Sequence, residues 1–288
     1  MGARYMSAVD EAYELLKSCR VCPRRCGVDR TAGQVGFCGV THRLRVASAA
    51  PHFGEEAPLV GSGGSGTIFL SGCNLACIFC QNYEISQFRE GRVISIDEMA
   101  KIMLALQGRR CHNINFVSPT HFAPQIMAAI DSAREQGLRL PIVYNSGGYD
   151  SVEMLRLLEG YVDIYMPDAK YWDESTAEEL SSAPDYPEVM RNALKEMHRQ
   201  VGDLVIEEGI ATRGLLVRHL VLPGGLAGSM EVIDFIAREI SPNTYVNVMD
   251  QYHPCYKARG HPVLGARPDP QLIADARRRA RALGLRLD

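Results

Sequence analysis

From residue 67 onward, apolar residues follow two alternating periods. Short runs rich in β-branched residues are separated by stretches in which apolar residues recur at i, i+3, i+4 and i+7, as at Met99, Ile102, Met103 and Leu106. The short runs predict strands and the longer stretches predict amphipathic helices, so their alternation indicates βα units and a parallel sheet. We therefore expect six strands, at residues 67–71, 113–117, 141–144, 162–166, 215–222 and 245–249.

Six βα units predict an α/β fold, a partial (β/α)6 TIM-type barrel that is an incomplete form of the eight-unit barrel. Folds of this kind carry their chemistry on the loops that follow the strands. The domain organisation we expect is an N-terminal helix with a four-cysteine metal-binding segment at 1–50, a Gly-rich linker at 51–66, the barrel at 67–265 and a helical tail at 266–288.

Composition and charge argue against nucleic acid and membrane as partners of this chain. The chain has 288 residues, of which 46% are hydrophobic, as in a globular protein with a substantial core. Its 31 Lys and Arg against 34 Asp and Glu give a net charge of −3, so no nucleic-acid partner is expected. Residues 1–16 read as a charged amphipathic helix, unlike a signal peptide, and no apolar stretch is long enough for a membrane span. We therefore expect a cytoplasmic protein with no membrane partner.

The nine cysteines are unevenly distributed, with seven in the first 80 residues. Because the cytosol keeps thiols reduced, clustered cysteines there more often bind metal than form disulfides. Cys73, Cys77 and Cys80 follow the first expected strand with the spacing CxxxCxxC. Three thiolates on a [4Fe-4S] cube leave one iron open, and an open iron can chelate S-adenosylmethionine (SAM) and deliver the electron that cleaves it.

Two other interpretations of this triplet remain. The cysteines can be buried as small apolar residues, or they can hold zinc with a distant fourth ligand such as His112 or Cys111. Without such a role, the isolated Cys111 and Cys255 are expected to be ordinary core residues.

The triplet, with aromatic Phe79 before its last cysteine, resembles the motif of the radical SAM superfamily. Within it the chain is most similar to the PflX-like group, which is related to pyruvate formate-lyase activating enzymes. The resemblance rests on GTIFLSGCNLACIFCQNYEIS, NINFVSPTHF, DIYMPDAKY, VRHLVLPGG and VNVMDQYHP. It implies an anaerobic oxidoreductase that cleaves SAM at a [4Fe-4S] cluster to a 5′-deoxyadenosyl radical and abstracts hydrogen from a substrate. It also implies a one-electron reductant, such as flavodoxin or ferredoxin, and a glycyl radical enzyme or another protein or peptide as partner.

The resemblance also implies SAM-binding residues, although no catalytic residue is assigned. Phe79 would lie near the adenine. Where relatives have Gly-Gly-Glu, this chain has Ser118, Thr120 and His121, which can replace that role or cap a helix. The remaining candidates are Asn82, Asn145, Asp168, Lys170, Arg218 and His253.

Several of these candidates also have a structural explanation. Asp168 and Lys170 match an Asp-x-Lys pattern that would clamp the SAM zwitterion, but they can equally form an ordinary loop ion pair. The fork of donors on Arg218 suits a carboxylate, and an acidic neighbour would satisfy it as well. Asn145 precedes two glycines that can admit a ligand or simply form a turn.

An earlier group of four cysteines is sufficient to enclose a metal completely. Cys19, Cys22, Cys26 and Cys38 fall within 20 residues. Four thiolates suit structural zinc or a second iron-sulfur cluster, and the sequence does not choose between them.

Three function classes therefore remain. The leading one is a radical SAM enzyme that activates a glycyl radical enzyme, and the second is radical modification of a small molecule or peptide. The third is a non-catalytic iron-sulfur electron carrier or a zinc-stabilised interaction protein.

Overall fold

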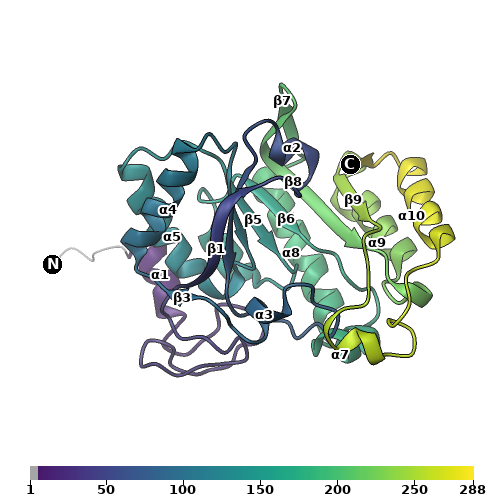
Figure 1. Ribbon diagram of the computed structural model, residues 1–288, viewed down its shortest axis with the longest axis horizontal. Helices are drawn as coiled ribbons and strands as arrows, with labels where there is room; N and C mark the ends of the chain where they lie inside the picture. The colour runs from purple at the N-terminus through teal and green to yellow at the C-terminus, as the bar shows by residue number, and fades with distance from the viewer. Residues whose placement is uncertain (1–5) are drawn as a thin grey trace.

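The computed structural model describes residues 6–288, so the first five residues of the expected N-terminal helix lie outside the described residues. The described chain contains a ten-stranded sheet (Figure 1), in which β7 pairs only with β8 and the other nine strands follow the order β10-β9-β8-β6-β5-β4-β2-β1-β3. The strands are β1 (Arg45–His52), β2 (Ser65–Leu70), β3 (Arg92–Val93), β4 (Ile114–Val117), β5 (Ile142–Ser146), β6 (Ile164–Pro167), β7 (Val205–Glu207), β8 (Ile210–Leu220), β9 (Tyr245–Met249) and β10 (Arg286–Leu287).

The six strands expected from the sequence are confirmed as β2, β4, β5, β6, β8 and β9. Each is parallel to the next, in register across the sheet, so that Phe69, Val117, Asn145 and Met166 stand side by side. Their carboxyl ends consequently lie at one edge, and the loops that follow them meet there. The α/β fold class with a mostly parallel sheet is thereby confirmed.

Helices connect these strands and cover them. They are α1 (Ala8–Glu14), α2 (Ala57–Val60), α3 (Tyr83–Ser86), α4 (Ile96–Gly108), α5 (Ala123–Glu135), α6 (Val152–Leu157), α7 (Glu174–Ser181), α8 (Tyr186–Val201), α9 (Ser229–Phe235) and α10 (Pro270–Ala282). Short single-turn or irregular helices occur at η1 (Thr120–Phe122), η2 (Pro223–Gly225), η3 (Ile236–Ile240) and η4 (Tyr256–Gly260). No helix within residues 6–288 combines the length and the apolar character needed to cross a membrane.

Local sequence explains where α4 begins. The Ser95 hydroxyl accepts from the Glu98 amide at 3.1 Å and the Glu98 carboxylate accepts from the Ser95 amide at 2.8 Å, so the expected capping box is present. Met99 and Met103 are buried on the sheet side of this helix, as the period of the sequence requires.

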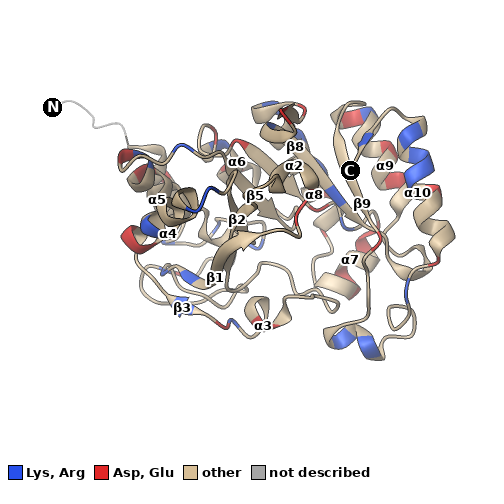
Figure 2. Cartoon of the chain, turned by 45° about the horizontal axis from the view of Figure 1, so that its top comes forward, with Lys and Arg blue, Asp and Glu red and all other residues tan. Residues whose placement is uncertain are grey.

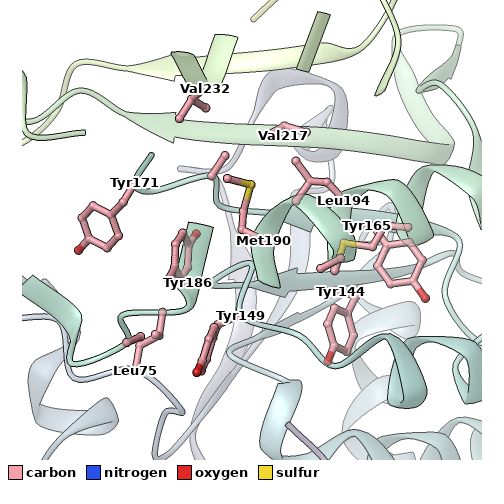
Figure 3. Close-up of a cluster of buried hydrophobic side chains, with 14 of the residues drawn as sticks. Leu75, Tyr144, Tyr149, Tyr165, Tyr171, Tyr186, Met190, Leu194, Val217 and Val232 are labelled. Atoms are coloured by element: carbon pink, nitrogen blue, oxygen red, sulfur yellow. The ribbon is translucent and has the colours of Figure 1, made fainter. Parts of the chain in front are cut away.

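On α8, the buried Met190 and Leu194 lie next to Val217 of β8 (Figure 3). The apolar face of α8, the most amphipathic helix of the chain, thus packs against the sheet and covers this part of the core.

Both ends of the sheet carry strands that the sequence did not predict. β1 pairs antiparallel with β2 and has β3 on its outer side. It runs across the boundary that we expected between the N-terminal segment (1–50) and the linker (51–66). Its composition, Arg-Val-Ala-Ser-Ala-Ala-Pro-His, lacks the β-branched alternation that marks a strand. At the other end β10 pairs parallel with β9.

The Arg-rich tail is attached to the fold. Figure 2 shows basic residues along α10 beside acidic residues of α9, and Arg279 donates to both carboxylate oxygens of Asp234 at 2.6 and 2.7 Å. Ala276 and Ala280 are fully buried beneath this helix. The helix is thus docked by one face, and its arginines are partly used within the chain.

Candidate functional site

A cavity of about 260 Å³ lies at the carboxyl ends of the parallel strands. All three cysteines of the triplet line it, on the loop after β2, and they face side chains from the loops or ends of β4, β5, β6 and β8. Seven other residues that the sequence pointed to also line this cavity: Phe79, Asn82, Ser118, Asn145, Asp168, Lys170 and Arg218. Residues distant in sequence therefore meet at the edge that a parallel α/β fold reserves for chemistry.

Donor groups surround the triplet thiols. The Leu75 amide donates to Cys73 Sγ at 3.4 Å, the Ser181 hydroxyl donates to Cys77 Sγ at 2.9 Å, and the Ser86 hydroxyl lies 3.2 Å from Cys80 Sγ. Hydrogen bonds to thiolate sulfur stabilise the charge of cluster ligands and tune the potential of a cluster. The environment therefore suits thiolates that serve as ligands.

Burial and charge act on these thiols in opposite directions. Burial raises the pKa of Cys73 to about 12 and also raises the pKa values of Cys77 and Cys80. The Lys170 ammonium opposes burial at all three thiols. A buried thiolate needs compensating positive charge. Lys170 supplies part of that charge, and a cationic metal centre at the triplet would supply the rest.

A compact charge network forms the opposite wall. Asp168 accepts from Lys170 Nζ at 2.5 Å and from Arg218 Nε at 2.9 Å, while Arg218 Nη2 donates to Asn145 Oδ1 at 2.6 Å. Burial opposes the ionisation of Asp168, but Arg218 and Lys170 outweigh it and hold its pKa below the usual value. Two cations share one carboxylate here, and the charges of Glu55 and Glu56 also act on Arg218. Lys170 gives one of its three donors to Asp168 and keeps the others for a ligand.

The backbone beneath this network is fixed by Tyr186 and a glycine. The Tyr186 hydroxyl donates to the Asp168 carbonyl at 2.8 Å and accepts from the Lys170 amide at 3.0 Å. Gly148 has φ +75°, and a Cβ there would lie 2.0 Å from the Asp168 carbonyl oxygen. Gly148 therefore lets the loop after β5 approach the backbone of the loop after β6 closely.

Three expected SAM-binding residues do not line the cavity. Thr120 donates to Asp150 Oδ1 at 2.7 Å within the core, and His253 is exposed, with its ring 3.3 Å from the Gln251 carbonyl. Thr120 opens η1 directly before α5, but its side chain caps neither helix and is bonded to Asp150 instead.

His121 is also withdrawn from the cavity. Its ring is fully buried and its Nε2 lies 3.0 Å from the Ser71 carbonyl, while its own carbonyl accepts from buried Arg30 at 2.7 Å. Burial, aided by the positive charge of Arg30, lowers the pKa of His121 to about 3. His121 is therefore a neutral group between the loop after β2, which carries the triplet, and the N-terminal segment around Arg30.

The four-cysteine segment, which we call the quartet (Cys19, Cys22, Cys26 and Cys38), folds into tight loops below β3 (Figure 1). Cys26 is half-buried and the other three are buried. Burial raises the pKa of Cys22 to about 12, and the charges of Cys38, Cys19 and Cys26 contribute in the same direction. The Phe37 amide donates to Cys26 Sγ at 3.4 Å.

Across residues 6–288, no three His, Cys, Asp or Glu side chains converge on the position of a single metal ion. The thiolates of a four-iron cluster bind separate irons, so they are not required to converge in this way.

Sequence reasoning missed several residues that shape the site. Ser181, at the end of α7, touches the triplet although it lies about a hundred positions away in the chain. Tyr252 lines the cavity with its ring 6.1 Å from that of Phe79. Cys255 is buried, as expected, and donates to the Phe79 carbonyl at 3.0 Å. Cys111 is also buried.

Comparison with known proteins identifies the family. The profile described as "Radical SAM superfamily" matches residues 67–236, which is more than half of the chain. The chain belongs to the radical SAM superfamily. Membership implies a [4Fe-4S] cluster and SAM, and the donors around Cys73, Cys77 and Cys80 fit such a cluster.

Two relatives of this radical SAM chain occur in Methanocaldococcus jannaschii. Uncharacterized protein MJ0674 is 35% identical over 90% of this chain and 73% of its own length. Uncharacterized protein MJ0808 is 25% identical over 83% of this chain and 71% of its own length. Their printed names assign no activity.

Solved structures that resemble the chain include SuiB of Streptococcus suis bound to S-adenosylmethionine, with 14% identity and a TM-score of 0.49 over 75% of this chain and 47% of that one. Methylornithine synthase (PylB) aligns with 16% identity and a TM-score of 0.48 over 77% of this chain and 63% of that one. The chain thus spans about half the length of the SuiB chain it matches.

Proposed function

We propose that Cys73, Cys77 and Cys80 hold a [4Fe-4S] cluster and that the cavity beside them binds SAM. The observation that carries this proposal is the meeting of the three thiols and the Asp168 network in one cavity. With one iron free of protein ligands, the cluster would chelate SAM and supply the electron that divides it into methionine and a 5′-deoxyadenosyl radical.

Each wall of the cavity has a role toward SAM. Lys170 and Arg218 offer cationic donors to its carboxylate, and Asp168 both orders the two cations and attracts the ammonium. Phe79, packed edge-on against Tyr252, supplies an apolar face for the adenine. Asn82, Ser118 and Asn145 add polar atoms around the rim. Thr120, His121 and His253 are left out of this assignment because they do not reach the cavity.

For the substrate, we propose the backbone of a protein or peptide, as in the activation of a glycyl radical enzyme. Support comes from the similarity of five sequence stretches to activating enzymes. Radical modification of a small molecule or of another peptide is the alternative. This oxidoreductase reaction would take place in the cytoplasm under anaerobic conditions, with flavodoxin or ferredoxin as the electron donor.

The quartet is proposed to hold a metal of its own, either structural zinc or a second iron-sulfur cluster. The burial of Cys19, Cys22 and Cys38 and a backbone amide that donates to Cys26 Sγ support metal binding.

SAM cleavage tests the proposal. Protein reconstituted anaerobically with iron and sulfide, then given SAM and dithionite, is expected to release 5′-deoxyadenosine. Cys77→Ala removes a cluster ligand and should lower the yield to background, while Cys111→Ala removes a buried thiol outside the site and should retain it. Equal yields from the two variants would refute the ligand assignment.

A further inference from the structure

The two cysteine groups are in direct backbone contact. Gly72, the residue before Cys73, adopts φ +86°, and a Cβ there would lie 2.9 Å from the carbonyl oxygen of Cys38. Cys38 is the last member of the quartet and Cys73 the first of the triplet. A path therefore runs from one thiol to the other through a few backbone bonds and one van der Waals contact.

Arg24 ties the same two loops together from the quartet side. It lies between Cys22 and Cys26, and its Nε donates to the Asn74 carbonyl, inside the triplet loop, at 2.9 Å. Its Nη2 donates to the Ser181 carbonyl at 3.3 Å, and Ser181 is the residue whose hydroxyl donates to Cys77 Sγ. One guanidinium from the quartet thus positions the backbone at two points that touch the triplet.

The outer side of the quartet differs from this inner side. Cys26 is half-buried, and it accepts from the amide of Phe37, whose side chain is 40% exposed, beside Val35, which is 52% exposed. Cys38, on the inner side, is buried against Gly72. The Phe37 ring packs against the guanidinium of Arg24 at 3.7 Å, so the quartet lies between these partly exposed residues and the triplet loop.

From this arrangement we propose that the quartet holds an iron-sulfur cluster, not zinc, and that it passes one electron at a time to the cluster of the triplet. The inference rests on the proposed function for the triplet. A reduced one-electron donor protein would give one electron to the quartet cluster, which would return to its oxidised state as that electron passed to the triplet cluster. The electron would end in the sulfonium of SAM, so one donor molecule would be oxidised for each SAM cleaved.

Electron paramagnetic resonance on reconstituted full-length protein tests the proposal. Wild type and the control Cys111→Ala should each bind about eight irons per chain if both groups hold [4Fe-4S] clusters, whereas Cys22→Ala should bind about half as many. After reduction with dithionite, the wild-type signal should be split or broadened by magnetic interaction between two neighbouring paramagnetic clusters. The Cys22→Ala signal should be unsplit, with about half the spin.

A redox titration of wild type alone keeps the test decisive if Cys22→Ala does not fold. The signal should be simple while one cluster is reduced and should become split when the second is reduced. Zinc in the quartet, or a fully reduced spectrum equal to the sum of two independent signals, would overturn the relay. Magnetically coupled clusters in a protein that releases no 5′-deoxyadenosine would instead refute the proposed function, while the proposed electron transfer between the clusters would stand.

Discussion

The two cysteine groups of this chain are neighbours, yet their surroundings differ. The triplet lines a cavity and faces Asp168, Lys170 and Arg218 across it, whereas none of the quartet cysteines is among the residues that line that cavity. The triplet has three thiols and the quartet four. Under the proposed function, the triplet keeps one metal position open for a ligand, whereas the four thiols of the quartet enclose their metal.

Removing the carboxylate that faces the triplet across the cavity should have the largest effect on stability and on SAM binding. Asp168→Ala leaves Lys170 and Arg218 close together without their shared carboxylate, and breaking a buried pair costs about 3 kcal/mol. Denaturant unfolding should show that loss, and calorimetry should show SAM binding weakened at least tenfold. The double variant Asp168→Ala, Lys170→Met should recover part of the stability, since one stranded cation is gone. A double variant less stable than the single one would contradict the network.

Forcing the two cysteine groups apart should have the next largest effect. In Gly72→Ala the new Cβ meets the Cys38 carbonyl, and the left-handed backbone adds strain, so we expect a loss of about 3 kcal/mol. Gly160→Ala is the matched control, because Gly160 has φ +85° with nothing within 4 Å of its Cβ position. The control should lose only the strain, about 1 kcal/mol. Equal losses in thermal or denaturant unfolding would mean that the contact with Cys38 is unimportant.

Stability should depend on pH through His121, between the loop that carries the triplet and the N-terminal segment. Its folded pKa of about 3 lies below its ordinary value, so the unfolded chain binds the proton first as pH falls. The stabilisation is complete above about pH 6.5 and declines below it, by about 2 kcal/mol at pH 5. Unfolding at pH 7.5 and pH 5 should show this loss in wild type and in the exposed-histidine control His253→Gln. His219 is also fully buried, which lowers its pKa to about 4, so it adds a similar loss of its own. His121→Gln should therefore remove about 2 kcal/mol of the wild-type loss and keep the rest, and an unchanged loss in that variant would contradict the role of His121.

Breaking an exposed ion pair between two outer helices should have the smallest effect on the free energy of unfolding. Arg279 and Asp234 join α10 to α9, with side chains 38% and 27% exposed. Arg279→Ala should therefore cost less than about 1 kcal/mol in unfolding free energy, with SAM cleavage unchanged. A loss as large as that of Asp168→Ala would show that exposed and enclosed pairs do not differ in this chain.

The sequence predicted the part of the molecule that follows local rules. The six parallel strands carry apolar runs, and Ser95 with Glu98 is a contiguous capping signal, so both were predictable. The loops after these strands had to meet at one edge, which is why Asp168, Lys170 and Arg218 were placed correctly relative to the triplet.

What the sequence missed depends on pairing and packing. β1 has a weak strand composition and exists because β2 offers it an edge. His121 follows the same strand as Ser118, but the turn of η1 sends it into the core. The reach of Arg24 to Asn74 and Ser181 depends on how the loops fold back, and no spacing in the chain encodes it.

The account rests most heavily on an open iron at Cys73, Cys77 and Cys80. Adding SAM to dithionite-reduced protein and recording its electron paramagnetic resonance spectrum tests this directly. We predict that SAM shifts the signal in wild type and in Cys22→Ala, and that Cys77→Ala gives no SAM-dependent shift. A wild-type spectrum indifferent to SAM, or a shift that survives in Cys77→Ala, would contradict the claim.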